Sequence, residues 1–163
     1  MSTIKETDEM VQSAQAAYQQ GEYALAAQLF GKAKEGYLQL GNALTSAEMA
    51  NNQSVALIKA GDAKAALQVV MGTDATFAGA GDLKRQAMAL GNQAAALEAT
   101  GKIKEAGEKY EQAADLFETA GESELRGVTL QSLSAIKLRQ HDQFGSLFTM
   151  QTALNSKKKL TVS

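Results

Sequence analysis

The sequence predicts an all-α protein built as a solenoid of four helix-turn-helix repeats, and three observations predict it. Glycine recurs every 20 residues, from position 21 to position 121. Between these glycines the chain is rich in Ala, Leu, Gln, Glu and Lys, and its 163 residues contain no proline, so helices can run without interruption. A second period of 40 residues indicates that each repeat comprises two helices.

The periodic glycines are predicted to separate the helices. Glycine can take the left-handed conformation that ends a helix, and the polar residue that follows it can begin the next one. These glycines are Gly21, Gly41, Gly61, Gly81, Gly101 and Gly121. The turns are only a few residues long, so successive helices should be antiparallel neighbours.

Eight helices are expected. Two of their starts carry a further signal, because Thr3–Glu6 and Thr45–Glu48 have capping-box spacing, in which a hydroxyl and a carboxylate satisfy free amides. The expected starts lie near Thr3, Glu22, Ser46, Asp62, Leu83, Lys102, Ser123 and Asp142.

The 40-residue period is clearest in the second helix of each repeat. A small residue lies five positions after the glycine and a large one nine positions after it, on one helical face. The pairs are Ala26 and Phe30, Ala66 and Val70, and Ala106 and Tyr110. In the fourth copy, His141 stands in place of the glycine, Ser146 is the small residue and Met150 is the large residue. The predicted repeats span about 3–41, 43–81, 83–121 and 123–157, in one domain over residues 1–163 that ends in a basic tail at 158–163.

Two segments carry a family resemblance. Residues 52–62 read NQSVALIKAGD and residues 92–102 read NQAAALEATGK. This pattern resembles the tetratricopeptide repeat (TPR), in a long variant with 40 residues per repeat. The resemblance implies a right-handed α-solenoid whose first helices line a concave wall, and it implies that this wall binds a peptide or helix of another protein.

The inner positions of the first helices are the candidate groove. Asn52 and Asn92 occupy the same repeat position, and the resemblance implies that such amides hold the backbone of an extended peptide. The alternative is that they bind the backbone of the neighbouring repeat. The candidate groove residues are Gln12, Asn51, Asn52, Val55, Lys59, Asn92, Ala95, Ser132, Ala135 and Arg139, and the inner stripe of the first repeat also includes Val11, Gln15 and Gln19. A carboxylate clamp is disfavoured because only Lys59 and Arg139 supply cations. The aromatic residues, Tyr18 and Phe30 among them, have helical core spacing and should pack inside.

The last helix is the candidate surface for a second activity. Solenoids normally end in a polar capping helix, whereas this helix carries apolar residues on more than one stripe. Self-association, docking of another protein, and a native segment beyond the sequence are the three explanations, and self-association is favoured. The residues for it are Phe144, Leu147, Phe148 and Leu154.

Composition excludes several kinds of site. The chain has no cysteine and a single histidine, which excludes disulfides, thiolate zinc sites and multi-histidine metal sites. A formal net charge of -2 offers no basic face for nucleic acid. We therefore expect a cytoplasmic, non-enzymatic protein without metal, cofactor or stable membrane insertion. Its partners would be another protein or peptide and, through the last helix, further copies in a homo-oligomer.

Overall fold

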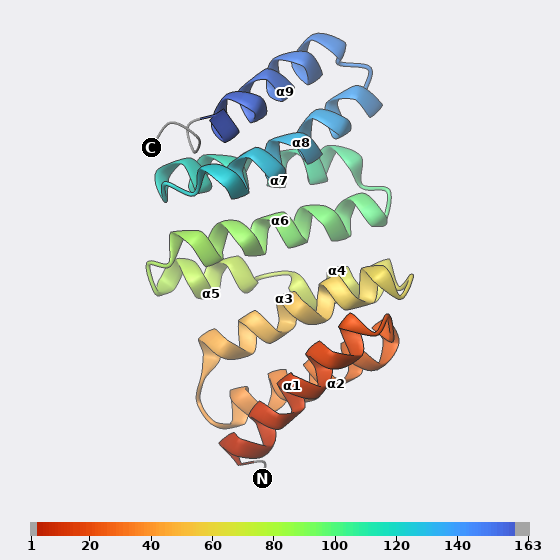
Figure 1. Cartoon of the computed structure of the whole chain (residues 1–163), viewed down its shortest axis with the longest axis vertical. Helices are drawn as coiled ribbons and strands as arrows, with labels where there is room; N and C mark the ends of the chain where they lie inside the picture. Colours follow the sequence, from red (N-terminus) through yellow and green to blue (C-terminus); the bar gives the residue numbers. More distant parts are fainter. Residues whose placement is uncertain (1–2, 159–163) are drawn as a thin grey trace.

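A computed structural model describes residues 3–158, and this range contains nine α-helices and no β-strand. The helices are α1 (Ile4–Gln19), α2 (Tyr23–Gln39), α3 (Ala43–Lys59), α4 (Ala63–Val70), α5 (Thr73–Gly79), α6 (Leu83–Ala99), α7 (Ile103–Thr119), α8 (Ser123–Arg139) and α9 (Gln143–Lys158). They are stacked in chain order, with α1 at one end of the molecule and α9 at the other (Figure 1). The predicted all-α solenoid is confirmed.

The turns between repeats and within them follow one geometry. The six periodic glycines have φ between 69° and 87°, the left-handed region predicted for them. At the first turn, Gly21 donates to the Tyr18 carbonyl at 3.1 Å and Glu22 donates to the Ala17 carbonyl at 2.9 Å. This pair of bonds is the Schellman motif, and it satisfies carbonyls that the end of a helix leaves free. His141 occupies the seventh such turn with φ 64°.

Two helix starts show how well the capping signals work. The capping box at Thr3 is present, with Glu6 N donating to Thr3 Oγ1 at 3.2 Å and Thr3 N donating to Glu6 Oε2 at 2.7 Å. The predicted start near Ser46 is wrong, because α3 begins at Ala43. Asn42 caps it, accepting a hydrogen bond from Thr45 N at 3.1 Å. Asparagine is a strong N-cap. Directly after the glycine turn, it begins the helix before the capping-box signal at Thr45–Glu48 is reached.

The prediction of eight helices is also wrong, because the helix expected from Asp62 is interrupted. Met71 is extended and Gly72 is left-handed with φ 85°, so α4 and α5 are separate segments (Figure 1). The carbonyl of Val70, freed by the break, accepts hydrogen bonds from Thr73 Oγ1 at 2.8 Å and from Gln93 Nε2 at 3.3 Å. Partners outside the helix therefore replace the helical bond that the break removes.

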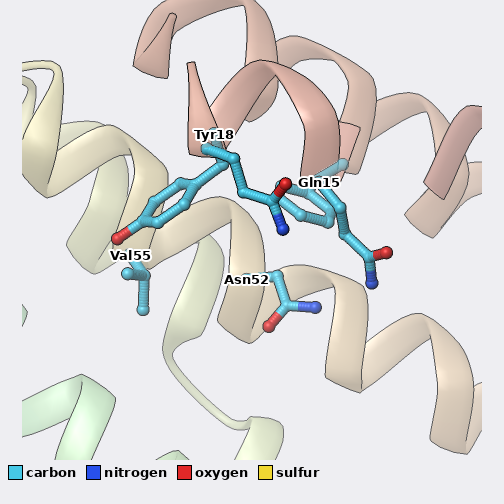
Figure 2. Close-up of a pocket in the computed structure, with 6 residues that line it drawn as sticks. Gln15, Tyr18, Asn52 and Val55 are labelled. Atoms are coloured by element: carbon cyan, nitrogen blue, oxygen red, sulfur yellow. The ribbon is translucent and has the colours of Figure 1, made fainter. Parts of the chain in front are cut away.

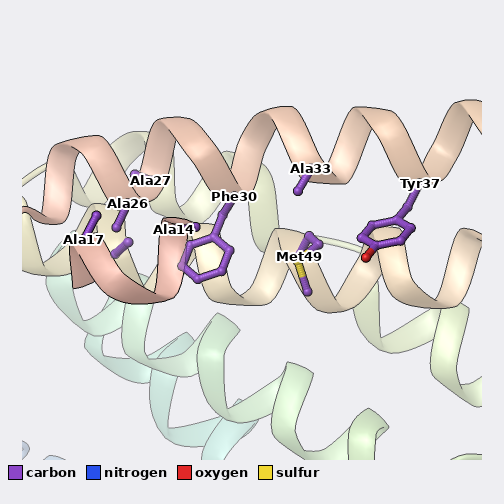
Figure 3. Close-up of a cluster of buried hydrophobic side chains, with 9 residues drawn as sticks. Ala14, Ala17, Ala26, Ala27, Phe30, Ala33, Tyr37 and Met49 are labelled. Carbon is purple, nitrogen blue, oxygen red and sulfur yellow. The ribbon is translucent and has the colours of Figure 1, made fainter. Parts of the chain in front are cut away.

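Alanine faces allow the helices to pack closely, and large side chains fill the remaining space. Figure 3 shows this in the first repeat, where the rings of Phe30 and Tyr37 lie among alanines of α1 and α2 and beside Met49 of α3. The predicted small positions Ala26, Ala66 and Ala106 are all fully buried. In the last repeat the large position, Met150, is exposed, since no helix covers that side of α9 within the described residues.

Candidate functional site

A pocket of about 300 Å³ lies where the first and second repeats meet. It is lined by Gln15, Tyr18 and Gln19 of α1, Phe30 of α2, and Asn52 and Val55 of α3. Figure 2 shows Gln15 and Tyr18 on one side of the pocket and Asn52 and Val55 on the other. The 40-residue period produces this arrangement, because it places the inner faces of α1 and α3, the first helices of successive repeats, on two sides of a pocket that Phe30 of α2 also lines.

The pocket combines an apolar interior with neutral polar groups. Phe30 is only 4% exposed, and Val55 is half-buried. Gln15 and Gln19 are exposed and Asn52 is half-buried, so their amides are accessible from solvent. Each amide carries both donors and an acceptor, and no charged side chain lines the pocket. The pocket can therefore take an apolar side chain while its amides bind a neutral polar backbone.

Asn51, which was predicted to face the groove, does not do so. It is 7% exposed, and its Oδ1 accepts a hydrogen bond from Thr73 Oγ1 at 3.0 Å. Adjacent side chains on a helix point about 100° apart, so Asn52 lines the pocket while Asn51 faces α5. The prediction for Asn51 is corrected accordingly: this residue holds α5 against α3.

The other predicted groove residues differ in accessibility. Gln12, Lys59, Ala135 and Arg139 are exposed, whereas Asn52, Val55, Asn92, Ala95 and Ser132 are half-buried. Only Asn52 and Val55 among them line the pocket. Tyr18 and Phe30, for which the sequence predicts packing alone, also line the pocket. The spacing of Tyr18, three residues after Gln15 on the same helical face, is the signal that could have placed it in the site.

The junction of the third and fourth repeats uses the equivalent positions differently. Glu98, Tyr110 and Ser132 stand 80 residues after Tyr18, Phe30 and Asn52. Arg139 binds Glu98 Oε1 at 2.8 Å, and the Tyr110 hydroxyl donates to Glu98 Oε2 at 3.2 Å. Burial, together with the nearby Glu98 carboxylate, raises the pKa of Tyr110 to about 12.

The two ends of the groove therefore differ chemically. Glu98, Tyr110 and Arg139 form one network across α6, α7 and α8. Arg139, one of the two cations predicted for the groove, is therefore already paired. At the first junction the positions of Glu98 and Tyr110 are occupied by Tyr18 and Phe30, which are neutral and line the pocket. The position of Arg139 is occupied there by Lys59, which is exposed and does not line the pocket.

Comparison with known proteins identifies the fold. No protein-family model and no curated protein matches the sequence. A crystal structure of a Podosopora anserina protein, described as a kinesin light chain with nearly identical TPR-like repeats, does match. The structure of a single-substitution variant of that protein matches with a TM-score of 0.79 and 16% sequence identity, and the match covers 98% of this chain and 78% of the other. A second structure of the protein has a TM-score of 0.58 and 13% identity, covering 100% of both chains. This chain has the TPR-like repeat fold. The predicted TPR resemblance is confirmed at the level of the fold.

The second candidate surface of this TPR-like solenoid is the outer face of α9. Phe144 is 88% exposed and Phe148 75% exposed, and Leu147 and Leu154 are exposed as well. The opposite face of α9 packs on α8, where Ser134 Oγ donates to the Ser146 carbonyl at 2.9 Å. The predicted basic tail at 158–163 lies outside the described residues, apart from the backbone of Lys158 at the end of α9.

Membrane spans and metal-binding clusters are both absent from the part of the chain that the structure describes. No helix there is both long and apolar enough to cross a membrane. Residues 3–158 also contain no group of three or more His, Cys, Asp or Glu side chains that could hold a metal ion.

Proposed function

We propose that this chain is a non-catalytic interaction module that binds an extended, uncharged peptide segment or a helix of a partner protein along α1, α3 and α6. TPR-like repeat folds generally serve as protein-interaction scaffolds and are typically non-enzymatic. The observation that carries the proposal is the pocket between the first two repeats, with its apolar interior and its accessible amides.

Binding would use two kinds of contact. An apolar side chain of the partner enters between Tyr18 and Val55 and packs on Phe30, and full burial of such a side chain stabilises a complex by about 1.5–3 kcal/mol. The Asn52 amide pairs with a backbone N–H or C=O of the partner, whatever side chains the partner carries. Asn92 repeats this contact on α6. Because the pocket is uncharged, affinity should depend only weakly on salt.

Asn52 and Asn92, the equivalent amides of α3 and α6, provide the experiment. Peptides selected from a displayed library against the intact chain are titrated by fluorescence anisotropy into wild type and the Asn52→Ala, Asn92→Ala double variant. Loss of two hydrogen bonds, each contributing about 1 kcal/mol, should weaken binding roughly 30-fold. Gln112→Ala, an exposed amide on α7, is the control and should bind like wild type.

Asn51→Ala separates binding from stability. This variant removes the bond to Thr73 and should lower the free energy of unfolding by about 1 kcal/mol without weakening peptide binding. The double variant should show the opposite pattern. If the selected peptides bind the double variant as tightly as wild type, the groove assignment fails.

The second candidate function is structural assembly through α9. The specific observation in its favour is the exposure of Phe144 and Phe148, since large apolar patches on soluble proteins commonly mark interaction sites. Static light scattering over a wide concentration range tests it, and a chain that stays strictly monomeric counts against self-association.

A further inference from the structure

The last repeat departs from the other three at two positions on α9. Phe144 corresponds to Ala24, Lys64 and Lys104, and Phe148 corresponds to Gln28, Gln68 and Glu108. All six of these counterparts are exposed, although in each case a following repeat is in place. A further repeat packed like the internal ones would therefore leave Phe144 and Phe148 in solvent.

Leu147 shows what a following repeat does cover. Its counterparts Ala27 and Gly107 are buried, and Leu67 is half-buried. At Gly107, an added Cβ would come within 3.2 Å of Ile136 on α8, so the next helix approaches closely there. Continuation of the solenoid would account for an apolar Leu147 but not for the two phenylalanines beside it.

The size and charge of this face favour a second copy of the same chain. An aromatic side chain presents about 150–250 Å², so the two phenylalanines and the two exposed leucines offer roughly 500 Å², and two copies would bury roughly 1,000 Å². That area lies at the lower limit for a specific interface. Residues 143–156 contain no Asp, Glu, Lys or Arg, so two such faces can meet without repulsion between like charges.

We propose that two copies of this chain pair through α9 in an isologous contact, in which the apolar face of each copy packs against the same face of the other. This face consists of Phe144, Leu147, Phe148 and Leu154. The proposal rests on the assembly function suggested above and names its partner. Because the pocket at Asn52 belongs to the other end of the solenoid (Figure 1), the dimer presents two open grooves. A ligand that carries two binding segments would then gain affinity by engaging both.

Sedimentation velocity of the full chain tests the proposal. Wild type should approach twice the 17.2 kDa mass of one chain as concentration rises. The variant with Phe144→Lys and Phe148→Gln, which restores residues found in the internal repeats, should raise the dimer dissociation constant at least about ten-fold. Both side chains are exposed, so its circular dichroism should match wild type. Leu38→Gln, at a 61% exposed leucine on α2, is the control and should leave the dimer intact.

A cysteine at the centre of the face tests the symmetry. The chain has no cysteine, so Leu147→Cys introduces a single thiol. Leu147 lies between Phe144 and Phe148, so in the proposed isologous contact its thiol lies near the two-fold axis and close to its own copy. Diamide should then link the chains covalently, whereas Leu38→Cys should remain without a covalent link under the same oxidant.

The outcomes separate the proposals. A monomer at every concentration overturns both the α9 dimer and self-assembly. A dimer that neither weakens in the phenylalanine variant nor crosslinks at Leu147→Cys overturns the α9 contact alone. Peptide binding by the phenylalanine variant should equal that of wild type.

Discussion

Substitutions at Gly101 and His141 should change stability in opposite directions. The two residues occupy equivalent turns, with φ 81° and 64°. A Cβ added at Gly101 would meet no atom within 4 Å, so Gly101→Ala measures the cost of the left-handed backbone without a steric clash. That cost is about 1–2 kcal/mol, and alanine recovers about 0.4–1 kcal/mol by restricting the unfolded chain.

The expected net loss for Gly101→Ala is therefore about 1 kcal/mol. His141→Gly reverses the argument, because it removes the left-handed cost and adds freedom to the unfolded chain. Histidine tolerates this region better than most residues, so the gain should be about 0.5 kcal/mol.

Urea denaturation, monitored by circular dichroism, measures both effects as shifts of the urea concentration at the unfolding midpoint. Hydrogen exchange of the α9 amides should show His141→Gly slowing the opening of the last repeat. If His141→Gly lowers the midpoint instead, the backbone argument is refuted, and the imidazole must stabilise the turn by a contact of its own.

Three further results are expected. Burial raises the pKa of Tyr37 and Tyr110 to about 12, above the value of about 10 for an unfolded chain. The free energy of unfolding should therefore be unaffected by these groups below pH 10 and fall as the pH rises toward 12. Urea midpoints that stay level between about pH 10 and 12 would contradict the raised pKa values. Ile136→Ala removes a fully buried side chain and should cost about 2–5 kcal/mol in thermal unfolding; a smaller loss would indicate that the core collapses around the cavity. The ion pair between Arg139 and Glu98 is partly exposed, so a double-mutant cycle should assign it less than about 1 kcal/mol, and a larger coupling would show that it is shielded from solvent.

The regular features of the fold were predictable because they depend on local chemistry. The glycine turns and the Thr3 capping box follow from residues within a few positions of each other. The break between α4 and α5 was not predictable in this way, because Ala66 and Val70 keep the helical register that precedes it. Of the bonds that stabilise the break, the one from Thr73 to the Val70 carbonyl is local, but the one from Gln93 on α6 forms only when the packed chain brings α6 to that carbonyl.

The candidate site was predictable in outline and not in detail. The repeat register correctly placed Asn52 and Val55 on one surface with Gln15, but it could not distinguish Asn52 from Asn51, since one step along the helix decides which amide is buried. Nor could it show that equivalent positions form a pocket at one junction and an ionic network at another. Peptide binding in the groove itself stays a prediction.

Closely packed helices in this chain are neighbours in sequence or, around the interrupted second repeat, at most three helices apart. Most contacts therefore form between segments that meet early as the chain collapses, which favours rapid folding. The same short-range order means that no single central element holds the molecule together. Under mechanical load applied to its two ends, the protein should lengthen in small successive steps, with terminal helices detaching first and the middle of the stack last.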